Sequence, residues 1–329
     1  MTPLIIDVDT GIDDSLALLY ALASPDAEVL AVTCVSGNVE ARQVALNTLR
    51  LLDMAGRSDI EVALGRLIPL VRPLMTAPDT HGPEGIGYAT LPATDHAVSE
   101  RHAADVIVDT ARARPGEVTL ITLGPLTNLA VALEREPALP QLLDGLVMMA
   151  GAYRSPGNTA PTSEWNVAVD PEAMDQVINA WANNPNIARP IALGLDVTER
   201  AKMTPDHLAQ LHAAAGNPAN SPVLQFIDDA LRFYMEFHSR YDGFYGAFIH
   251  DALAVASTLD RSLVRTEALT VQVELKGELT YGETVTDWRR VWGRQPNVDI
   301  AVEANIAEFF QRFIDRVGSL AANARNVAI

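Results

Sequence analysis

The chain has 329 residues, of which 48% are hydrophobic and 20% are charged. This composition is that of an ordinary globular protein and excludes a largely disordered chain. The 24 Lys and Arg residues against 42 Asp and Glu residues give a formal net charge of -18, which disfavours binding to nucleic acid polymers. Small neutral ligands remain the expected partners.

The cellular compartment is indicated by the single cysteine and the N-terminal segment. Cys34 has no second cysteine with which to form an intramolecular disulfide, so nothing points to an oxidising compartment. The N-terminal apolar run is short and lacks a preceding basic region, so we expect no signal peptide. No stretch approaches the roughly 18 to 20 apolar residues that a membrane helix needs. We therefore expect a cytoplasmic protein that does not bind membranes.

Short apolar or β-branched runs alternate with longer runs of helical period from the N-terminus onward. The predicted buried strands are 3–8, 28–35, 118–123, 146–149 and 190–195. The predicted helices between and after them are 13–23, 41–55, 126–134 and 171–181, with Gly56 as the stop of the second. This alternation predicts an α/β fold with a mostly parallel, doubly wound, Rossmann-like sheet that carries helices on both faces.

The C-terminal part of the chain departs from this alternation. Two alternating segments within 269–285 flank Gly277-Glu278 and predict a small antiparallel hairpin, and 303–316 predicts an amphipathic helix. No linker, low-complexity tract or long repeat marks a boundary, so we expect one domain spanning 1–329. The glycine-, proline- and asparagine-rich segments 76–91 and 151–166 are long for connections and are candidate active-site loops.

The most informative motif is Asp7-Val8-Asp9-Thr10-Gly11-Ile12-Asp13-Asp14, with four carboxylates at the end of the first predicted strand. In open α/β sheets ligands bind beyond the carboxyl ends of the strands. Carboxylates this close repel one another unless a cation neutralises them, and their hard oxygens suit Ca²⁺ or Mg²⁺. The simpler alternative is that Asp13 and Asp14 only cap the following helix.

The spacing of these residues does not match other common metal- and phosphate-binding motifs. An EF-hand loop starting at Asp7 requires glycine at its sixth position and glutamate at its twelfth, where this chain has Ile12 and Leu18. Phosphate-binding loops and dinucleotide fingerprints are absent from the sequence. An aspartate-nucleophile phosphatase, with Asp7 as the nucleophile, remains as an alternative, although Gly11 departs from its opening pattern.

Further polar residues follow the predicted strands. Asn38 follows the second strand, and Gly124 follows the strand 118–123, where it would free a neighbouring backbone carbonyl for a metal. Candidate loop residues are Asn158, Glu164, Trp165 and Asn166 in one long loop and His81 in the other. His250 and Asp251 precede an apolar helical stretch at 252–259, where Asp251 would either cap the helix or complete a metal site.

Taken together, these motifs resemble those of the inosine-uridine preferring nucleoside hydrolases. The matches lie near 7–14, 36–38, 81–87, 123–128, 148–172 and 250–256, and so extend over nearly the whole chain. The resemblance implies an α/β enzyme that uses Ca²⁺ to cleave the N-glycosidic bond of purine or pyrimidine ribonucleosides, such as inosine or uridine, in nucleoside salvage or catabolism. It also implies a homodimer or homotetramer.

By position, the resemblance implies a calcium site and two catalytic groups. The calcium ligands would be Asp9, Asp14, Asp251 and the backbone carbonyl of Leu123. Asp9 would also be the general base for the metal-bound water, and His250 would protonate the leaving base. Such a metal grips a cis-diol and lowers the pKa of its water, while carboxylates stabilise the positive charge that develops on the sugar.

The resemblance also implies how the substrate is held. Asp13, Asn38 and Asn166 would bind the 2′- and 3′-hydroxyls of ribose, and Asn158 and Glu164 the 5′-hydroxyl. Met149 would pack against the sugar, and His81 and Trp165 would lie near the base. In the segment before His250, Tyr241 and Tyr245 are candidates for contact with the base. A nucleoside- or ribose-binding protein without catalysis is the second alternative.

Overall fold

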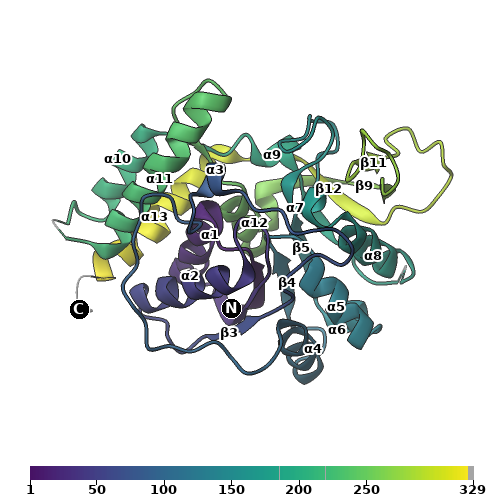
Figure 1. The fold of residues 1–329 in the computed structure, drawn as a ribbon, viewed down its shortest axis with the longest axis horizontal. Coiled ribbons are helices and arrows are strands. Elements are labelled where there is room, and N and C mark those ends of the chain that lie inside the picture. The colour runs from purple at the N-terminus through teal and green to yellow at the C-terminus, as the bar shows by residue number, and fades with distance from the viewer. Residues whose placement is uncertain (185, 219, 325–329) are drawn as a thin grey trace.

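An eight-stranded sheet runs through the described part of the computed structural model, which comprises residues 1–184, 186–218 and 220–324 (Figure 1). In spatial order its strands are β3 (Glu61–Leu64), β2 (Ala27–Cys34), β1 (Thr2–Val8), β4 (Thr119–Thr122), β5 (Gly145–Met149), β6 (Ile191–Leu193), β12 (Val298–Ala304) and β9 (Val264–Leu269). Only the β12–β9 pairing is antiparallel among these strands. The predicted mostly parallel sheet is therefore confirmed.

The strand order places a switch point between β1 and β4. From β1 the chain builds outward through β2 and β3 on one side, and then returns to add β4, β5 and β6 on the other. The connections that leave β1 and β4 therefore diverge at their carboxyl ends and open a crevice there. The acidic motif directly follows β1, so the topology places it at this crevice.

Side chains of β1 alternate between two hydrophobic cores, one on each face of the sheet. Leu4, Ile6 and Val8 pack into one core together with α1 (Ile12–Ala23), α2 (Ala41–Met54), α11 (Pro222–Tyr241), α12 (His250–Leu259) and α13 (Ile306–Asn323). Ile5 packs into the other core, against α4 (Ala103–Ala113), α5 (Thr127–Arg135) and α8 (Pro171–Ala182). Figure 1 shows these two groups of helices on opposite sides of the strands. The fold is doubly wound, as predicted.

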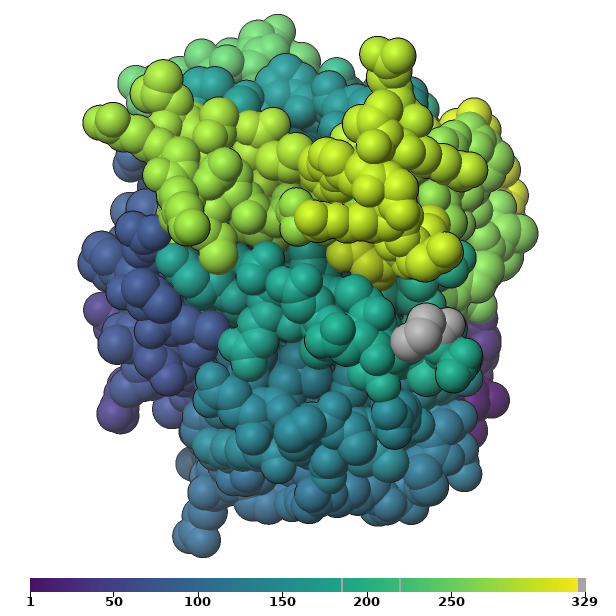
Figure 2. Space-filling model, turned by 90° about the vertical axis from the view of Figure 1, so that its right-hand side faces the viewer, coloured from purple at the N-terminus to yellow at the C-terminus, as the bar shows by residue number. Residues whose placement is uncertain are grey.

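The remaining elements are short, apart from one longer helix. They are α3 (Pro78–His81), α6 (Leu139–Leu142), α7 (Trp165–Val169), α9 (Leu195–Thr198), α10 (Pro205–Ala214), the 3-10 turn Arg261–Leu263, and the paired strands β7 (Lys202–Met203) and β8 (Ala247–Phe248). The predicted hairpin is formed by β10 (Val271–Val273) and β11 (Thr284–Thr286), with a longer loop than expected. In Figure 2 this yellow-green part of the chain lies on the surface over the teal middle segment.

Several elements differ from the sequence prediction. The helix predicted at 303–316 begins at Ile306 and ends at Asn323. It begins later than predicted because residues up to Ala304 form strand β12, which pairs with the edge strand β9. Among the longer elements, β3, β9, β12, α4, α10 and α11 were not predicted. No helix in the described part of the chain is long and apolar enough to cross a membrane.

Candidate active site

A cavity of about 550 Å³ opens at the carboxyl ends of the central strands. Its lining includes twelve of the thirteen residues to which the sequence analysis assigned a metal, catalytic or substrate-binding role: Asp9, Asp13, Asn38, His81, Leu123, Met149, Asn158, Glu164, Trp165, Asn166, His250 and Asp251. Asp14, the thirteenth, lies directly behind this lining and is fully buried. Both long loops that were predicted to line an active site contribute residues to the wall.

Asp9 is the buried carboxylate at the end of β1. Its Oδ2 accepts a 2.7 Å hydrogen bond from the backbone N–H of Asn38, which follows the neighbouring strand β2. Its Oδ1 is buried and has no hydrogen-bond partner among the described residues. A buried carboxylate oxygen without a partner is costly, so this atom is suited to a cation or to a substrate donor.

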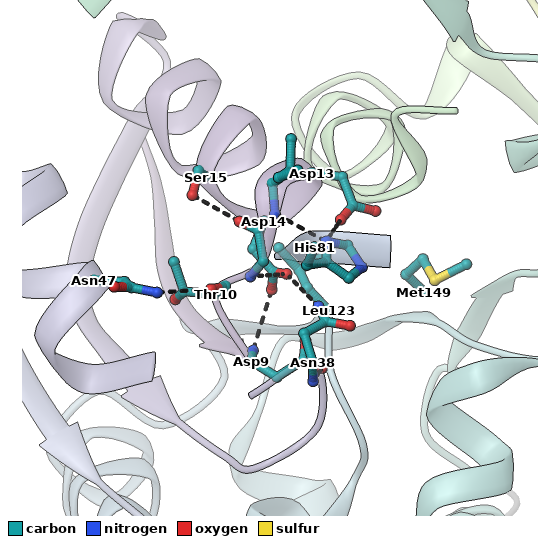
Figure 3. Close-up of polar contacts among 12 residues, drawn as sticks. Asp9, Thr10, Asp13, Asp14, Ser15, Asn38, Asn47, His81, Leu123 and Met149 are labelled. Carbon is teal, nitrogen blue, oxygen red and sulfur yellow. Dashed lines mark hydrogen bonds and ion pairs between the residues drawn. The ribbon is translucent and has the colours of Figure 1, made fainter. Parts of the chain in front are cut away.

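Asp14 joins the start of α1 to Asp9. Its Oδ1 accepts the backbone N–H of Asp9 at 3.2 Å, and its Oδ2 accepts the backbone N–H of Gly11 at 2.9 Å and the side-chain amide of Asn38 at 3.2 Å. Figure 3 shows these bonds beside Asp9. Asp14 thus caps the N-terminus of α1, as the simpler alternative predicted. The same hydrogen bonds fix its carboxylate next to the cavity.

Three carboxylates gather where α1 meets α12. One oxygen each of Asp13, Asp14 and Asp251 lie within 4.8 Å of one another, and all three side chains are buried. Burial and the nearby charge of Asp14 raise the pKa of Asp13 to about 8, and burial also raises the pKa of Asp9, Asp14 and Asp251 above the usual range. A divalent cation would relieve this repulsion, so the residues fit a metal with a preference for oxygen ligands.

Asn166 and Glu164 also line the cavity. The Asn166 amide donates to the carbonyls of Leu123 at 2.7 Å and Met149 at 3.0 Å. Glu164 accepts the backbone N–H groups of Asn166 and Val167, which caps α7, and that of Gly151 at 2.9 Å. The long loop is therefore fixed to the ends of β4 and β5 by its polar side chains.

Asn158 and Trp165 form the outer part of the same loop. The side-chain oxygen of Asn158 accepts the backbone N–H of Trp165 at 2.9 Å. The indole Nε1 of Trp165 is buried without a partner among the described residues, although the ring lines the cavity. The residue therefore offers an aromatic face and an unused donor to a ligand.

Two predicted histidines line the cavity, His81 from α3 and His250 from the start of α12. His81 Nδ1 accepts the backbone N–H of Ile12 at 3.2 Å, and His250 Nδ1 is 2.8 Å from the hydroxyl of Thr198. Burial lowers the pKa of His81 and of His250 to about 3. In both rings one nitrogen is thus held by the protein, and the other is left for a ligand.

Helix α11 and the segment after it form a part of the wall in which the sequence indicated only Tyr241. Helix α11 contributes Tyr234, Phe237, His238, Tyr241 and the following Asp242, and β8 contributes Phe248. Tyr241 was a candidate for the base and does line the cavity, whereas Tyr245 does not and is half-exposed. The amphipathic period of α11 was the signal that would have placed these side chains on one face.

The geometry argues against the phosphatase alternative. Asp7, its expected nucleophile, is fully buried and does not line the cavity. Its Oδ1 accepts hydrogen bonds from Thr33 and, at 2.8 Å, from the amide of Asn128. Asp7 and Asn128 therefore tie β1 to β2 and α5 beneath the site.

A doubly wound sheet with a cavity at its switch point, lined by buried carboxylates and asparagines, defines an enzyme that binds a small polar molecule. The family described as inosine-uridine preferring nucleoside hydrolase matches residues 4–311. The chain belongs to this family, as its motifs predict, and is thereby a nucleoside hydrolase.

Curated relatives and solved structures agree. The chain is 36% identical to the pyrimidine-specific ribonucleoside hydrolase RihA of Salmonella gallinarum, over 96% of this chain and 98% of that protein. It is 35% identical to the inosine-uridine preferring nucleoside hydrolase of Crithidia fasciculata, over 95% and 96%. The structure of a purine-preferring ribonucleoside hydrolase from Gardnerella vaginalis superposes with a TM-score of 0.90 at 29% identity, covering 98% and 99% of the chains. The names of these three relatives state different preferences for the nucleobase.

Proposed function

We propose that this protein hydrolyses the N-glycosidic bond of purine or pyrimidine ribonucleosides with the help of bound Ca²⁺. The products would be ribose and the free base, in nucleoside salvage or catabolism in the cytoplasm. The observation that carries the proposal is the cluster of buried carboxylates beside the unpartnered Oδ1 of Asp9. We further propose that residues 1–329 act as one domain within a homodimer or homotetramer.

Asp9, Asp14, Asp251 and the carbonyl of Leu123 would hold the metal. These groups supply hard oxygen ligands, which Ca²⁺ prefers. The fourth group, the Leu123 carbonyl, accepts only one hydrogen bond among the described residues, so a lone pair is left for a metal. When bound, Ca²⁺ supplies Lewis acidity, which polarises a water molecule and the ribose diol.

The carboxylates and amides of the chain would bind and orient the sugar. Asp13, Asn38 and Asn166 line the cavity near Asp9 and suit the 2′- and 3′-hydroxyls. Glu164 and Asn158 suit the 5′-hydroxyl, and Met149 packs against the ring. As the glycosidic bond breaks, positive charge develops at the anomeric carbon, which the surrounding carboxylates stabilise.

Two proton transfers complete the reaction. Asp9 would accept the proton of the attacking water through its free Oδ1. His250 would donate a proton to the departing base, with its Nδ1 held near Thr198, while His81 and Trp165 lie beside the base. Attack by water on the face opposite the base would give ribose of inverted configuration.

Replacing Asp9 with alanine tests this proposal. The Asp9→Ala protein should bind nucleoside weakly and release no measurable ribose. When both proteins are free of metal it should melt no lower than the wild type, because a buried, repelled charge is removed. Asp26→Ala, at a surface ion pair with Arg316, serves as the control and should keep its activity. An Asp9→Ala protein that releases ribose at the wild-type rate would overturn the proposed role.

Membership of the nucleoside hydrolase family argues against the second alternative, a protein that binds nucleosides without cleaving them. Equilibrium dialysis with labelled inosine and uridine, together with a ribose assay, separates the two. Saturable binding by the wild type without any ribose would favour the binding protein.

A further inference from the structure

We propose that His238, oriented by Asp242, is a second proton donor to the departing nucleobase, separate from His250. The inference rests on the proposed nucleoside hydrolysis and adds a catalytic residue to it. Both side chains line the cavity, at the C-terminal end of α11.

The pair has the geometry of a histidine held by a carboxylate. His238 Nδ1 donates to Oδ2 of Asp242 at 2.7 Å, which fixes the ring orientation. The other nitrogen, Nε2, is buried and has no hydrogen-bond partner among the described residues. A buried donor without a partner is unfavourable, so a ligand in the cavity is the natural acceptor.

The hydrogen-bond partners distinguish His238 from the other cavity histidines. The Nδ1 of His81 accepts a backbone N–H, and the Nδ1 of His250 lies near a neutral hydroxyl. His238 alone among these three is hydrogen-bonded to a carboxylate. A carboxylate on one ring nitrogen stabilises the imidazolium, which is the form that can give up a proton from Nε2.

Aromatic side chains hold the His238 ring from several directions. The ring centroid lies 4.6 Å from that of Tyr234, 4.7 Å from that of Phe248 in an edge-on arrangement, and 5.5 Å from that of Phe244 in a stacked one. Phe248 contacts both histidines, because its ring centroid also lies 5.6 Å from that of His250. The cage limits the ring to one orientation and excludes bulk water from it.

The charges around His238 act in opposite directions. Burial lowers the pKa of His238, and the hydrogen bond and charge of Asp242 oppose that lowering. Lys202 on β7, which lies over the Phe244 and Phe248 rings, lowers this pKa further. The other titratable groups facing the pair are Tyr234 on α11, His81 on α3, His250 on α12 and Glu199 after α9.

The proposed step is balanced within the hydrolysis. The bond between the anomeric carbon and the base nitrogen breaks, and its electron pair goes to the base. The proton on His238 Nε2 passes to a nitrogen or oxygen of the base, while water adds to the anomeric carbon and gives its proton to Asp9. After the base leaves, a proton from solvent returns to Nε2 through the emptied cavity, while Nδ1 keeps its hydrogen bond to Asp242.

Two variants test the proposal, and a third serves as a matched control. His238→Gln removes the proton but keeps a polar side chain, and Asp242→Asn keeps the histidine but removes the charge that holds its proton. His212→Gln disrupts another histidine–aspartate pair, 2.8 Å apart, which does not line the cavity. Ribose release is measured against pH with inosine, uridine and p-nitrophenyl riboside, whose leaving group departs without a proton.

We expect His238→Gln to lower kcat at least about tenfold on one or both nucleosides, and to leave p-nitrophenyl riboside within about twofold. Asp242→Asn should move the loss of activity at high pH to lower pH, because the pKa of His238 falls without its carboxylate. Equal slowing of all three substrates, or unchanged pH profiles and rates in both variants, would overturn the inference. A wild type that cleaves none of the three substrates would instead contradict the proposed function.

Discussion

A Cβ atom on Gly37 would lie 2.1 Å from Oδ2 of Asp9, so the Asp9 carboxylate occupies the space that a side chain at position 37 would fill. Gly124 is similarly close, since its Cβ would lie 2.8 Å from Oδ1 of the same carboxylate. Two glycines, from the ends of β2 and β4, therefore set the position of Asp9 at the switch point of the sheet.

Gly37→Ala should displace Asp9 and lower kcat about 100-fold, because misplacing a catalytic group by about 1 Å has an effect of this size. Gly145→Ala is the matched control, since its Cβ would meet nothing nearer than 3.7 Å. Ribose release and circular dichroism of both variants check the prediction. Wild-type activity in Gly37→Ala would show that the position of Asp9 is not critical.

Metal removal should destabilise the protein because Asp13, Asp14 and Asp251 repel one another when no cation is bound. Ca²⁺ at 100 times its dissociation constant would stabilise the folded state by about 2.7 kcal/mol. Scanning calorimetry with chelator, and then with excess Ca²⁺, should therefore show a rise in Tm on addition. Asp251→Asn should largely remove this rise; a full rise in that variant would place the metal elsewhere.

His250→Ala should affect substrates according to their leaving groups. If His250 donates a proton to the base, the variant should cleave inosine about 100-fold more slowly, and p-nitrophenyl riboside at nearly the wild-type rate. Steady-state kinetics with the two substrates provide the measurement. Equal slowing on both would leave His250 with a structural role through Thr198.

The packing of α13 against α1 should matter for stability and not for chemistry. Phe313 is fully buried and stacks on Tyr20 with ring centroids 6.0 Å apart, and neither residue lines the cavity. Phe313→Ala should reduce the free energy of unfolding by about 3 to 5 kcal/mol, measured by urea denaturation. Ribose release by the folded fraction should stay at the wild-type level. A large loss of ribose release would show that packing around Phe313 affects the active site.

The sequence predicted the centre of the sheet well because its strands are buried on both faces. β1, β2 and β4 are short apolar runs that end in polar or glycine residues, so both the strand and its functional end are visible locally. Strand β12 was missed because its residues, which pair with β6 and with the edge strand β9, are only partly apolar. Glu303, predicted to begin a helix, lies in this strand.

Residues whose role depends on distant segments were less visible. The carboxylates of Asp13, Asp14 and Asp251 meet only because α1 packs against α12. The family motifs brought Asp251 into the predicted site, but no motif marked Tyr234, His238 or Asp242. Their approach to the cavity depends on where α11 docks, which the local sequence does not specify.

The most direct test is a reducing-sugar assay of the purified protein over a panel of purine and pyrimidine ribonucleosides. The assay is run as purified, after treatment with chelator, and after addition of Ca²⁺. We expect that ribose is released from at least one nucleoside, that chelator abolishes the release, and that Ca²⁺ restores it. Undiminished ribose release from the chelator-treated, metal-free protein would contradict the calcium-dependent mechanism, and no release from any nucleoside with Ca²⁺ present would contradict nucleoside hydrolysis itself.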